Sequence, residues 1–336
     1  MIEKTQLVVA RSTNPYENLA LEEYLLDQVR PGVITLYLWQ NRQTVVIGQN
    51  QNAWQECRVK QLEEEGGHLA RRLSGGGAVF HDLGNLNFTF LVPREEYDVA
   101  RQCRVIARAV ASYGLEVERT GRNDILIEGR KFSGNAFFRR GDTAYHHGTL
   151  LLSVDMANLS RYLNVSQEKL RSKGVASVAA RVANLTEFCP AITAKEMRLR
   201  LADALGEEYG AAPEKLAFET FDENTLRNLT DKYSSWDWKF GKKLPFDHTF
   251  TARFPWGGVQ ICLSVNSGII THAEVYSDAM DSDFFKKLPE KWRGLPYQSA
   301  LLRQSLKGLA LCPELGYEAD ETVLRDLDEL LSQQNF

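Results

Sequence analysis

The segment Ala70–Asn85, ARRLSGGGAVFHDLGN, is the part of this sequence from which fold and function are most easily inferred. Two arginines precede an uninterrupted glycine run, Gly75–Gly77, and a histidine, an aspartate and an asparagine follow it. Glycine permits positive φ and lets another group reach a main-chain N–H, so such a run beside strands can form a concave array of donors for an anion such as phosphate. A tight turn or a barrel corner is the alternative. The segment matches neither a Walker loop nor a Rossmann fingerprint.

The residues around this segment predict an α+β fold with a mixed or antiparallel sheet. Asn14 and Pro15 can begin a helix, and glycines can end two others, at Gly66 and at Gly114. Strands are expected at 33–39, 44–48, 78–82, 86–92, 124–129, 130–140 and 144–155. Helices are expected at 16–29, 53–65, 97–115, 194–209, 223–234 and from about 321.

Chain length predicts two domains, because 336 residues exceed the size at which a single core stops growing. The segment Trp238–Phe250 mixes glycine, proline and lysine, as a linker does. We therefore expect a large domain over residues 1–245, and a small α+β domain over 246–336 that contains a hairpin at 257–278.

Composition is that of a soluble globular protein, with 43% hydrophobic and 25% charged residues. A net charge of -4 argues against a dedicated nucleic-acid binder. The five cysteines are scattered without a CxxC pair, which predicts reduced thiols in the cytoplasm. The sequence shows neither a signal-peptide pattern nor an apolar run of about 18 residues, so we expect neither secretion nor membrane spanning.

Candidate functional residues cluster in four segments. Arg71 and Arg72 are adjacent and should face opposite ways on a strand, so we expect one of them to enter a pocket. In GRNDILIEGRKFSGNA, Gly121–Ala136, Lys131 precedes small residues where a ligand could approach a strand closely. Taken alone, a lysine at this position is most often a solvated surface charge, and Asp124 is by default a turn or cap residue.

The other two segments contain histidines and a glycine-rich loop. His146 and His147 should lie on opposite faces of a strand, with one of them pointing inward, where the alternative is a hydrogen-bonded core histidine. The run KGVASVAARVANL, from Lys173, predicts a mobile loop at least as readily as a binding element.

Taken together and in this order, these segments closely resemble the lipoate-protein ligases of bacterial type. The matching stretches are RRLSGGGAVFHDLGNLNFTF, GRNDILIEGRKFSGNA, HHGTLLL and KGVASVAARVANLTE, with NPYENLALEE, TVVIGQNQNAWQEC and WGGVQICLSVNSGIITHAEVYSD in support. The resemblance covers essentially the whole chain. It implies a catalytic domain of the biotin/lipoate ligase fold and a small C-terminal accessory domain.

The same resemblance implies a two-step reaction with Mg²⁺, ATP and lipoate. Lipoyl-adenylate forms first, and the lipoyl group then passes to a lysine of a lipoyl domain of a 2-oxoacid dehydrogenase E2 subunit or of the glycine-cleavage H protein. A monomer is expected, with no nucleic acid or membrane as partner. A cation held between a carboxylate and a phosphate stabilises the transition state of such an activation, and Lys131 matches the family's lysine in that role.

The resemblance also assigns the remaining site residues. Catalysis falls to Lys131 with Asp124, the latter also as the magnesium ligand. The nucleotide is expected at Arg72, Gly76, Gly77, Ala78, Val79, Phe80, Lys131, Lys173 and Val175, and lipoate at Lys131, Gly75, Gly76, Asn85 and His147. Leu19, Val46, Val79 and Phe88 are candidates for an apolar tunnel around the acyl chain.

Three alternatives share parts of this pattern. Octanoyl transferases of the same fold need a nucleophilic cysteine near the lysine, and this sequence has none between Cys103 and Cys189. Biotin ligases have a different glycine–arginine loop. A non-catalytic paralogue that binds lipoate or an acceptor would release no pyrophosphate when lipoate and ATP are added.

Overall fold

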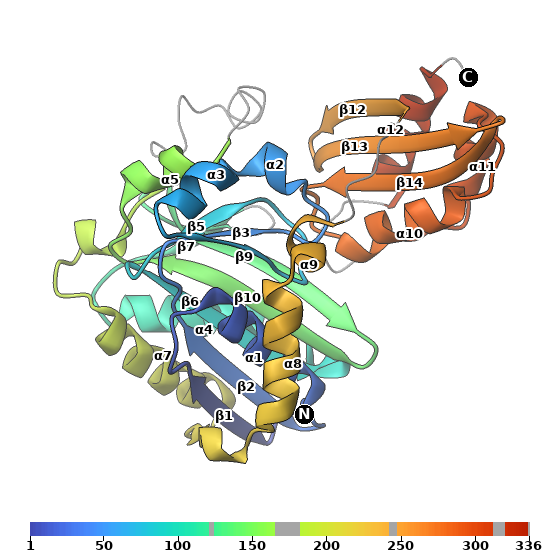
Figure 1. The fold of residues 1–336 in the computed structure, drawn as a ribbon. Helices are drawn as coiled ribbons and strands as arrows, with labels where there is room; N and C mark the ends of the chain where they lie inside the picture. Colours follow the sequence, from blue (N-terminus) through green and yellow to red (C-terminus); the bar gives the residue numbers. More distant parts are fainter. Residues whose placement is uncertain (121–123, 165–181, 242–246, 312–319, 335–336) are drawn as a thin grey trace. The chain divides into compact units, whose positions relative to one another are not determined.

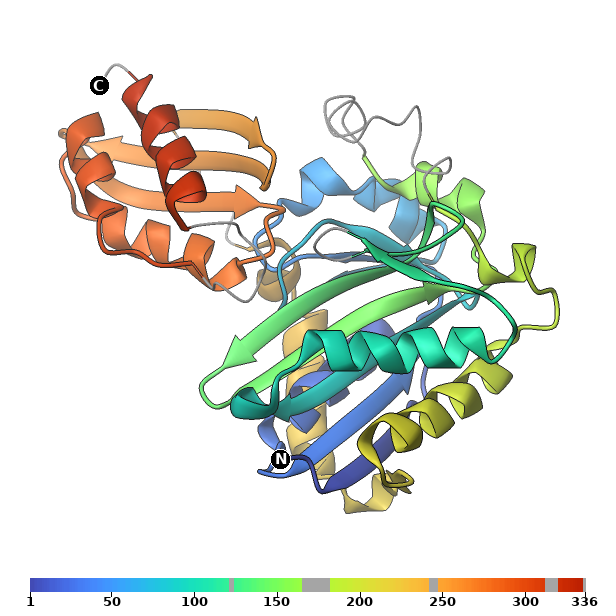
Figure 2. The ribbon, with the colours of Figure 1, turned by 180° about the vertical axis from the view of Figure 1, so that it is seen from behind.

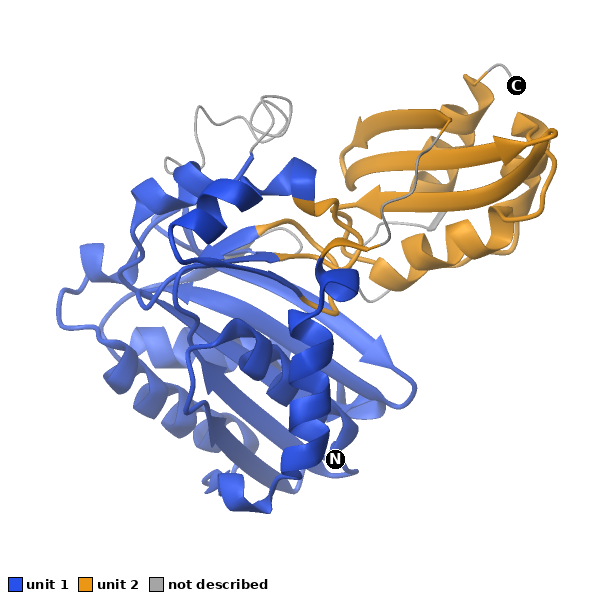
Figure 3. Ribbon diagram, in the orientation of Figure 1, with its two compact units in different colours: residues 1–46, 54–71, 79–239 blue, residues 47–53, 72–78, 240–336 orange. Residues whose placement is uncertain are grey.

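The computed structural model describes residues 1–120, 124–164, 182–241, 247–311 and 320–334. The chain forms two compact units, coloured separately in Figure 3. Unit 1 comprises residues 1–46, 54–71 and 79–239, and unit 2 comprises 47–53, 72–78 and 240–336. Two inner segments therefore pack with the C-terminal part of the chain, while the boundary predicted after residue 245 stays a prediction.

Unit 1 is built on an eight-stranded sheet in the order β11-β1-β2-β6-β10-β9-β8-β7 (Figure 1). Strand β1 pairs in parallel with β2 and β11, and the other neighbours in this sheet pair antiparallel. The predicted mixed sheet is thus confirmed. The strands are β1 (Lys4–Val9), β2 (Val33–Trp39), β6 (Asn85–Pro93), β7 (Glu118–Thr120), β8 (Asp124–Ile127), β9 (Arg130–Arg140), β10 (Thr143–Leu151) and β11 (Glu214–Lys215). A second sheet orders β4 (His68–Arg71), β3 (Thr44–Ile47) and β5 (Val79–His81).

Helices cover both faces of the large sheet. Figures 1 and 2 show α4 and α7 on one face, and α1 with α8 on the other. The main apolar core lies between the sheet and α4 and α7, where Leu86, Phe88 and Phe90 of β6 pack. The described helices that lie wholly or mostly in unit 1 are α1 (Pro15–Asp27), α2 (Ala53–Glu56), α3 (Val59–Glu64), α4 (Val99–Ala111), α5 (Met156–Tyr162), α7 (Ala194–Tyr209), α8 (Glu223–Ser234) and α9 (Trp236–Phe240).

Helix α1 has a capped N-terminus and contains two buried carboxylates. Asn14 caps it, its side chain accepting a hydrogen bond from the N–H of Tyr16, and Pro15 occupies the first turn as predicted. Ten of its residues are buried, among them Glu22 and Glu23. Buried carboxylates require partners, and α1 contacts β6 and β10 on one side and α8 on another.

Unit 2 contains an antiparallel sheet covered by helices. Its strands are β12 (His248–Phe254), β13 (Gly257–Asn266) and β14 (Ile269–Ser277), and its helices are α10 (Ser282–Trp292), α11 (Ser299–Ser305) and α12 (Asp320–Ser332). Trp256 ties the sheet to α12 through a 2.9 Å hydrogen bond from Nε1 to Asp326. The predicted hairpin and terminal helix are thus present.

Two sequence-based predictions of local structure were wrong. The helix expected over 53–65 is broken between α2 and α3, because the backbone at 56–58 bonds to another segment: Arg58 N–H donates to Tyr162 O, and Asn164 N–H donates to Glu56 O, both at 2.9 Å. The linker expected over 238–250 includes the end of α9 and the start of β12.

Candidate active site

The large sheet has one polar face, on the side of α1. Along β6, Asn85, Asn87 and Thr89 alternate with apolar residues that enter the core. The hydroxyl of Thr89 donates to Glu22 of α1 at 2.7 Å, which shows that this polar face is the one α1 covers. A sheet face buried yet polar is unusual, since buried polar groups cost free energy unless paired.

Strand register aligns polar residues into a row across this face. Trp39 of β2 is opposite Asn87, which is opposite Thr149 of β10. Thr149 Oγ1 accepts from the N–H of Gly134 at 3.2 Å, and Gly134 in turn is opposite Asp124 of β8. The row therefore leads from an aromatic side chain to the segment that contains Lys131.

A β-bulge determines where Lys131 points. Between β8 and β9, Ile125 pairs with Ser133 and Leu126 pairs with Lys131, so Phe132 is the extra residue. Without a bulge, Lys131 and Gly134 would face opposite sides of the strand; with it, a Cβ placed on Gly134 would lie 2.8 Å from Nζ of Lys131 and 2.9 Å from its Cε. The absence of a side chain at Gly134 gives the lysine its position.

Asp124 holds the amine of Lys131. The Nζ–Oδ1 distance is 2.6 Å, and both side chains are largely but not fully buried, with 21% and 12% of their surface exposed. The main chain of Lys131 is fixed as well, since its carbonyl accepts from Ala183 N–H at 2.9 Å. The structure thus brings together two of the predicted site residues as a positioned cation and its carboxylate partner.

His147 forms a buried pair with Glu22. Nδ1 of His147 lies 2.8 Å from Oε1 of Glu22, which also accepts from Thr89, and Thr89 accepts from Nε1 of Trp39 at 3.1 Å. Glu22 and His147 are buried. Sequence reasoning missed Glu22, although an acidic pair within the apolar helix segment NLALEEYLL was a usable signal.

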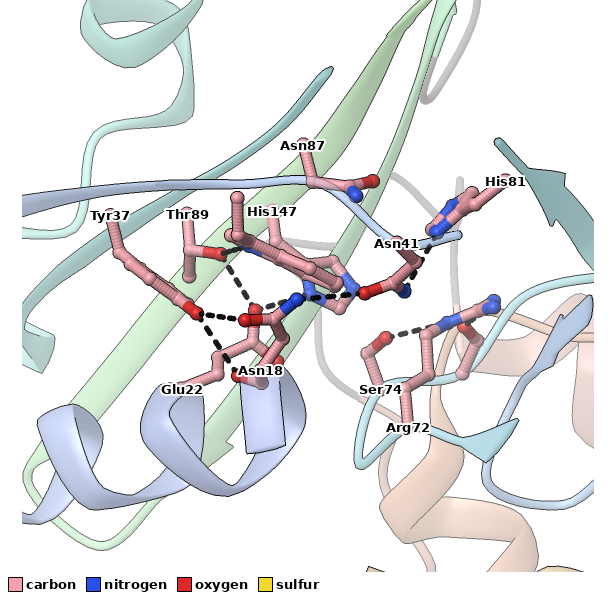
Figure 4. Close-up of polar contacts among 12 residues, drawn as sticks. Asn18, Glu22, Tyr37, Asn41, Arg72, Ser74, His81, Asn87, Thr89 and His147 are labelled. Carbon is pink, nitrogen blue, oxygen red and sulfur yellow. Dashed lines mark hydrogen bonds and ion pairs between the residues drawn. The ribbon is translucent and has the colours of Figure 1, made fainter. Parts of the chain in front are cut away.

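A second chain of amides adjoins this pair, as Figure 4 shows. Tyr37 donates to Asn18 Oδ1 at 3.2 Å, Asn18 donates to Asn41 Oδ1 at 2.9 Å, and Asn41 lies 3.2 Å from Nδ1 of His81. Burial raises the pKa of Tyr37, so its hydroxyl stays protonated as a donor. This network fixes α1 on the polar face.

Asn85 and Asn87 end this face. Asn85 Nδ2 donates to Asn87 Oδ1 at 2.9 Å, and both residues are buried. Asn85 Oδ1 and Asn87 Nδ2 have no hydrogen-bond partner among the described residues. Buried polar atoms in this condition are rare and mark strain, function or a bound ligand.

The two adjacent histidines both point inward, whereas sequence reasoning expected this of one. His146 lies in the apolar core beside Phe88, Phe90 and Phe137, with its ring nitrogens 3.1 Å from Gln102 and 2.8 Å from Asn135. His146 is the hydrogen-bonded core histidine of the alternative interpretation. Phe88 shares that core, so its suggested place along an acyl tunnel was wrong.

The glycine run belongs to unit 2. Nη2 of Arg72 donates to Gly75 O at 2.7 Å and Gly77 O at 2.8 Å, and Nε donates to Ser74 at 3.0 Å. Gly76 has φ +88°, and its N–H donates to Ala279 O at 3.0 Å. The side chain of Arg72 and the N–H of Gly76 therefore both donate hydrogen bonds to residues of unit 2.

Close backbone packing explains one of these glycines directly. A Cβ on Gly75 would lie 2.5 Å from Met280 O and 2.6 Å from Ala279 O, distances that side chains do not tolerate against main chain. Arg71, which lies in unit 1, instead donates to Lys239 O at 2.6 Å. The two arginines thus have different partners, and the expectation that one of them enters a pocket stays a prediction.

The remaining predicted residues are dispersed. Val79 and Phe80 lie in β5, where Phe80 is buried against Tyr162 with ring centroids 5.5 Å apart. Ala78 ends the loop in unit 2, and Lys173 and Val175 lie outside the described residues. Within the part of the chain that the structure describes, no group of three or more His, Cys, Asp or Glu residues could hold a metal ion. The described helices include none with the length and apolar composition needed to cross a bilayer.

Comparison with known families identifies the class of enzyme. Residues 14–206, more than half of the chain, match the lipoyl protein ligase A/B catalytic domain, and the chain belongs to this family. Residues 243–327 match the bacterial lipoate protein ligase C-terminus. The protein is therefore an enzyme of the lipoate-protein ligase type, with both of the parts that the sequence predicted.

Solved structures of similar proteins agree. LipL1 of P. falciparum, crystallised in complex with lipoate, is 26% identical, with a TM-score of 0.84 over 98% of this chain and 100% of that one. A chain from the structural analysis of an archaeal lipoylation system, a bi-partite lipoate protein ligase and its E2 lipoyl domain from Thermoplasma acidophilum, is 28% identical, with a TM-score of 0.62 over 73% of this chain and 99% of that one. Lipoate-protein ligase A bound with ATP is 26% identical, with a TM-score of 0.60 over 72% and 99%. These likenesses confirm the fold class.

Proposed function

We propose that this ligase activates lipoate with ATP and then transfers the lipoyl group to a lysine amine of an acceptor domain. The observation that carries the proposal is the amine of Lys131, held by Asp124 at 2.6 Å over the bare backbone of Gly134. Structures of similar proteins with lipoate or with ATP support the choice of substrates.

Lys131 can act in the first step by bringing two anions together. A carboxylate oxygen of lipoate attacks the α-phosphorus of ATP. The bond between the α-phosphorus and the oxygen that bridges to the β-phosphorus breaks, and pyrophosphate leaves with that oxygen. The cation stabilises the additional negative charge on the α-phosphoryl oxygens more than it stabilises the separated reactants. An ammonium carries several donors, so it can contact both reactants at once.

The same amine can act in the second step. The neutral amine of an acceptor lysine attacks the acyl carbon of the mixed anhydride, a proton is lost from nitrogen, and AMP leaves with the bridging oxygen. Lys131 would stabilise the negative charge on the departing phosphate. The charge of this side chain is thus needed throughout the reaction.

Mg²⁺ would enter with ATP. Magnesium is commonly bound through one or two carboxylates together with the phosphates of the substrate, and Asp124 offers a carboxylate beside the lysine. The metal would neutralise phosphate charge.

We also propose that Arg72, Gly75, Gly76 and Gly77 bind the nucleotide and the activated acyl group, and that His147 and Asn85 line the lipoate site.

A transferase that uses a cysteine thioester is less well supported. Burial raises the pKa of Cys57 to about 12, and it also raises the pKa of Cys262, so neither thiol readily ionises. Cys103 is in the core on the far face of the sheet, and Cys189 packs against that core. None of these four described thiols is suited to act beside Lys131.

We propose lipoyl domains of 2-oxoacid dehydrogenase E2 subunits and the glycine-cleavage H protein as acceptors. The Thermoplasma ligase was solved in a study of a lipoylation system with its E2 lipoyl domain. We also propose a reducing compartment, the cytoplasm, which is supported by Cys57, Cys189 and Cys262 lying outside any disulfide bond. We further propose that the protein works as a monomer.

The decisive test incubates the protein with MgATP, lipoate and an apo lipoyl domain or apo H protein. The expected result is pyrophosphate release and a gain in acceptor mass equal to lipoate less one water. Substitution of the target lysine in the acceptor should abolish the mass gain and leave pyrophosphate release unchanged. If wild-type protein releases no pyrophosphate with lipoate and ATP, the proposal is wrong.

A further inference from the structure

We infer that the buried amide pair of Asn85 and Asn87 makes the enzyme select acyl substrates with sulfur at the far end of the chain over hydrocarbon chains of similar length. This inference rests on the proposed function and concerns the same site. Its basis is the pair of side-chain atoms on β6 that have no partner among the described residues, Asn85 Oδ1 and Asn87 Nδ2.

The unsatisfied groups do not depend on how the two amides are oriented. In the observed orientation Asn85 donates to Asn87 at 2.9 Å, which leaves one carbonyl oxygen and one amino group over. Turning both amides round exchanges the roles of the two residues and still leaves one acceptor and one donor. Both residues are buried, with 0% and 1% of their surface exposed, so bulk water does not satisfy these groups.

The pair lies at a suitable distance from the reacting amine. Asn87 is opposite Thr149 on the neighbouring strand, and Thr149 bonds to Gly134, over which the Lys131 amine lies. Adjacent strands are about 4.8 Å apart, so two strand steps separate Asn87 from Gly134 by about 10 Å. An acid whose carboxylate contacts Lys131 and whose chain follows this row would bring its distal end to Asn87.

The chemistry of the two candidate substrates differs at that end. The dithiolane ring of lipoate carries sulfur atoms, which accept hydrogen bonds weakly, whereas the tail of octanoate offers no acceptor. An acid that leaves a buried amide unpaired when it binds has a less favourable binding free energy than an acid that pairs with the amide. The aromatic Trp39, opposite Asn87 in the same row, would contact either chain.

The test compares lipoate with octanoate in wild-type protein and in Asn87→Leu, by kcat/KM for pyrophosphate release with MgATP. We expect wild-type protein to favour lipoate, and loss of the unpaired donor to reduce the lipoate-to-octanoate ratio by about tenfold. Asn87→Leu removes this donor in the observed orientation, and Asn85→Leu/Asn87→Leu removes it in either orientation. Asn87→Leu also removes the partner of Asn85, so Asn85→Leu/Asn87→Leu is made in parallel; replacing both partners of a bond is far less destabilising. The matched control is Leu86→Met, on the same strand but facing the core, which should leave the ratio unchanged.

The outcomes separate this inference from the proposed function. If neither acid supports pyrophosphate release by wild-type protein, the proposed function fails. If both acids do, and the ratio stays within about twofold of wild type in both folded variants, the amide pair does not select the substrate. A lower ratio in Leu86→Met of the same size would equally overturn the inference, since that residue faces away from the site.

Discussion

Nζ of Lys131 lies 2.6 Å from Oδ1 of Asp124, in a position that the bulge at Phe132 creates and the missing side chain of Gly134 permits. The lysine is thus directed toward the polar face of the sheet, in line with Thr149 and Asn87. The predictions below begin from this arrangement and extend to the buried acids of α1.

Neutralising Lys131 should abolish the activation of lipoate. For Lys131→Gln we expect pyrophosphate release to fall on the order of a hundredfold or more, because a charge that stabilises the transition state is lost. Arg130→Gln is the matched control: Arg130 is the preceding residue, and its guanidinium pairs with Glu187 at 2.8 Å on the surface. Near-normal turnover by Lys131→Gln would show that the chemistry depends on another group.

Adding one methyl group at Gly134 should impair activity more than stability. The new Cβ would meet the flexible end of Lys131, which can move away, so we expect Gly134→Ala to fold and to lose at least about tenfold in pyrophosphate release. Steady-state kinetics and thermal unfolding of the same sample would separate the two effects. Full activity in a folded Gly134→Ala protein would contradict the positioning argument.

The neighbouring Gly148 should behave in the opposite way. A Cβ there would lie 2.7 Å from Gly134 O and 2.6 Å from a ring atom of Phe88, neither of which is free to move. We expect Gly148→Ala to lower the free energy of unfolding by about 1–3 kcal/mol. Urea unfolding measures this, and an unchanged midpoint would show that β10 adapts.

Replacing Glu22 should destabilise the fold, because it leaves His147 and Thr89 without their shared buried acceptor. For Glu22→Leu we expect a loss of about 2–3 kcal/mol in the free energy of unfolding. Glu17→Leu, on the exposed side of the same helix, should cost less than about 1 kcal/mol. Equal losses in the two variants would mean that the buried pair contributes little.

Glu23 should make stability depend on acid pH. Burial raises its pKa, but the hydrogen bonds from Lys232 and Arg140 outweigh this and hold the pKa below the ordinary value of 4.5. A carboxyl with a lowered folded-state pKa contributes stability above its unfolded pKa and loses it as pH falls through the folded value. The stability difference between wild type and Glu23→Gln should thus be full at pH 7 and shrink below about pH 4.5. Urea unfolding across this range measures it; a difference independent of pH would exclude the ion pairs as its source.

Local sequence patterns determined much of the secondary structure of this protein and the family that its motifs indicate. Asn14 and Pro15 fixed the start of α1, and alternation fixed β6 and β10. The glycine, lysine and histidine motifs indicated the ligase family by their order along the chain. These features depend on residues close together in the sequence, where capping, side-chain periodicity and backbone freedom act directly.

Tertiary structure decided the contents of the site. Glu22 meets His147 across 125 residues, and the orientation of Lys131 depends on a bulge whose pairing is set between two strands. The break between α2 and α3 depends likewise on backbone bonds to residues 162–164, and Gly75 packs against Met280. Strand register and backbone packing between distant segments fix such contacts, and neither follows from the residue types of one segment alone.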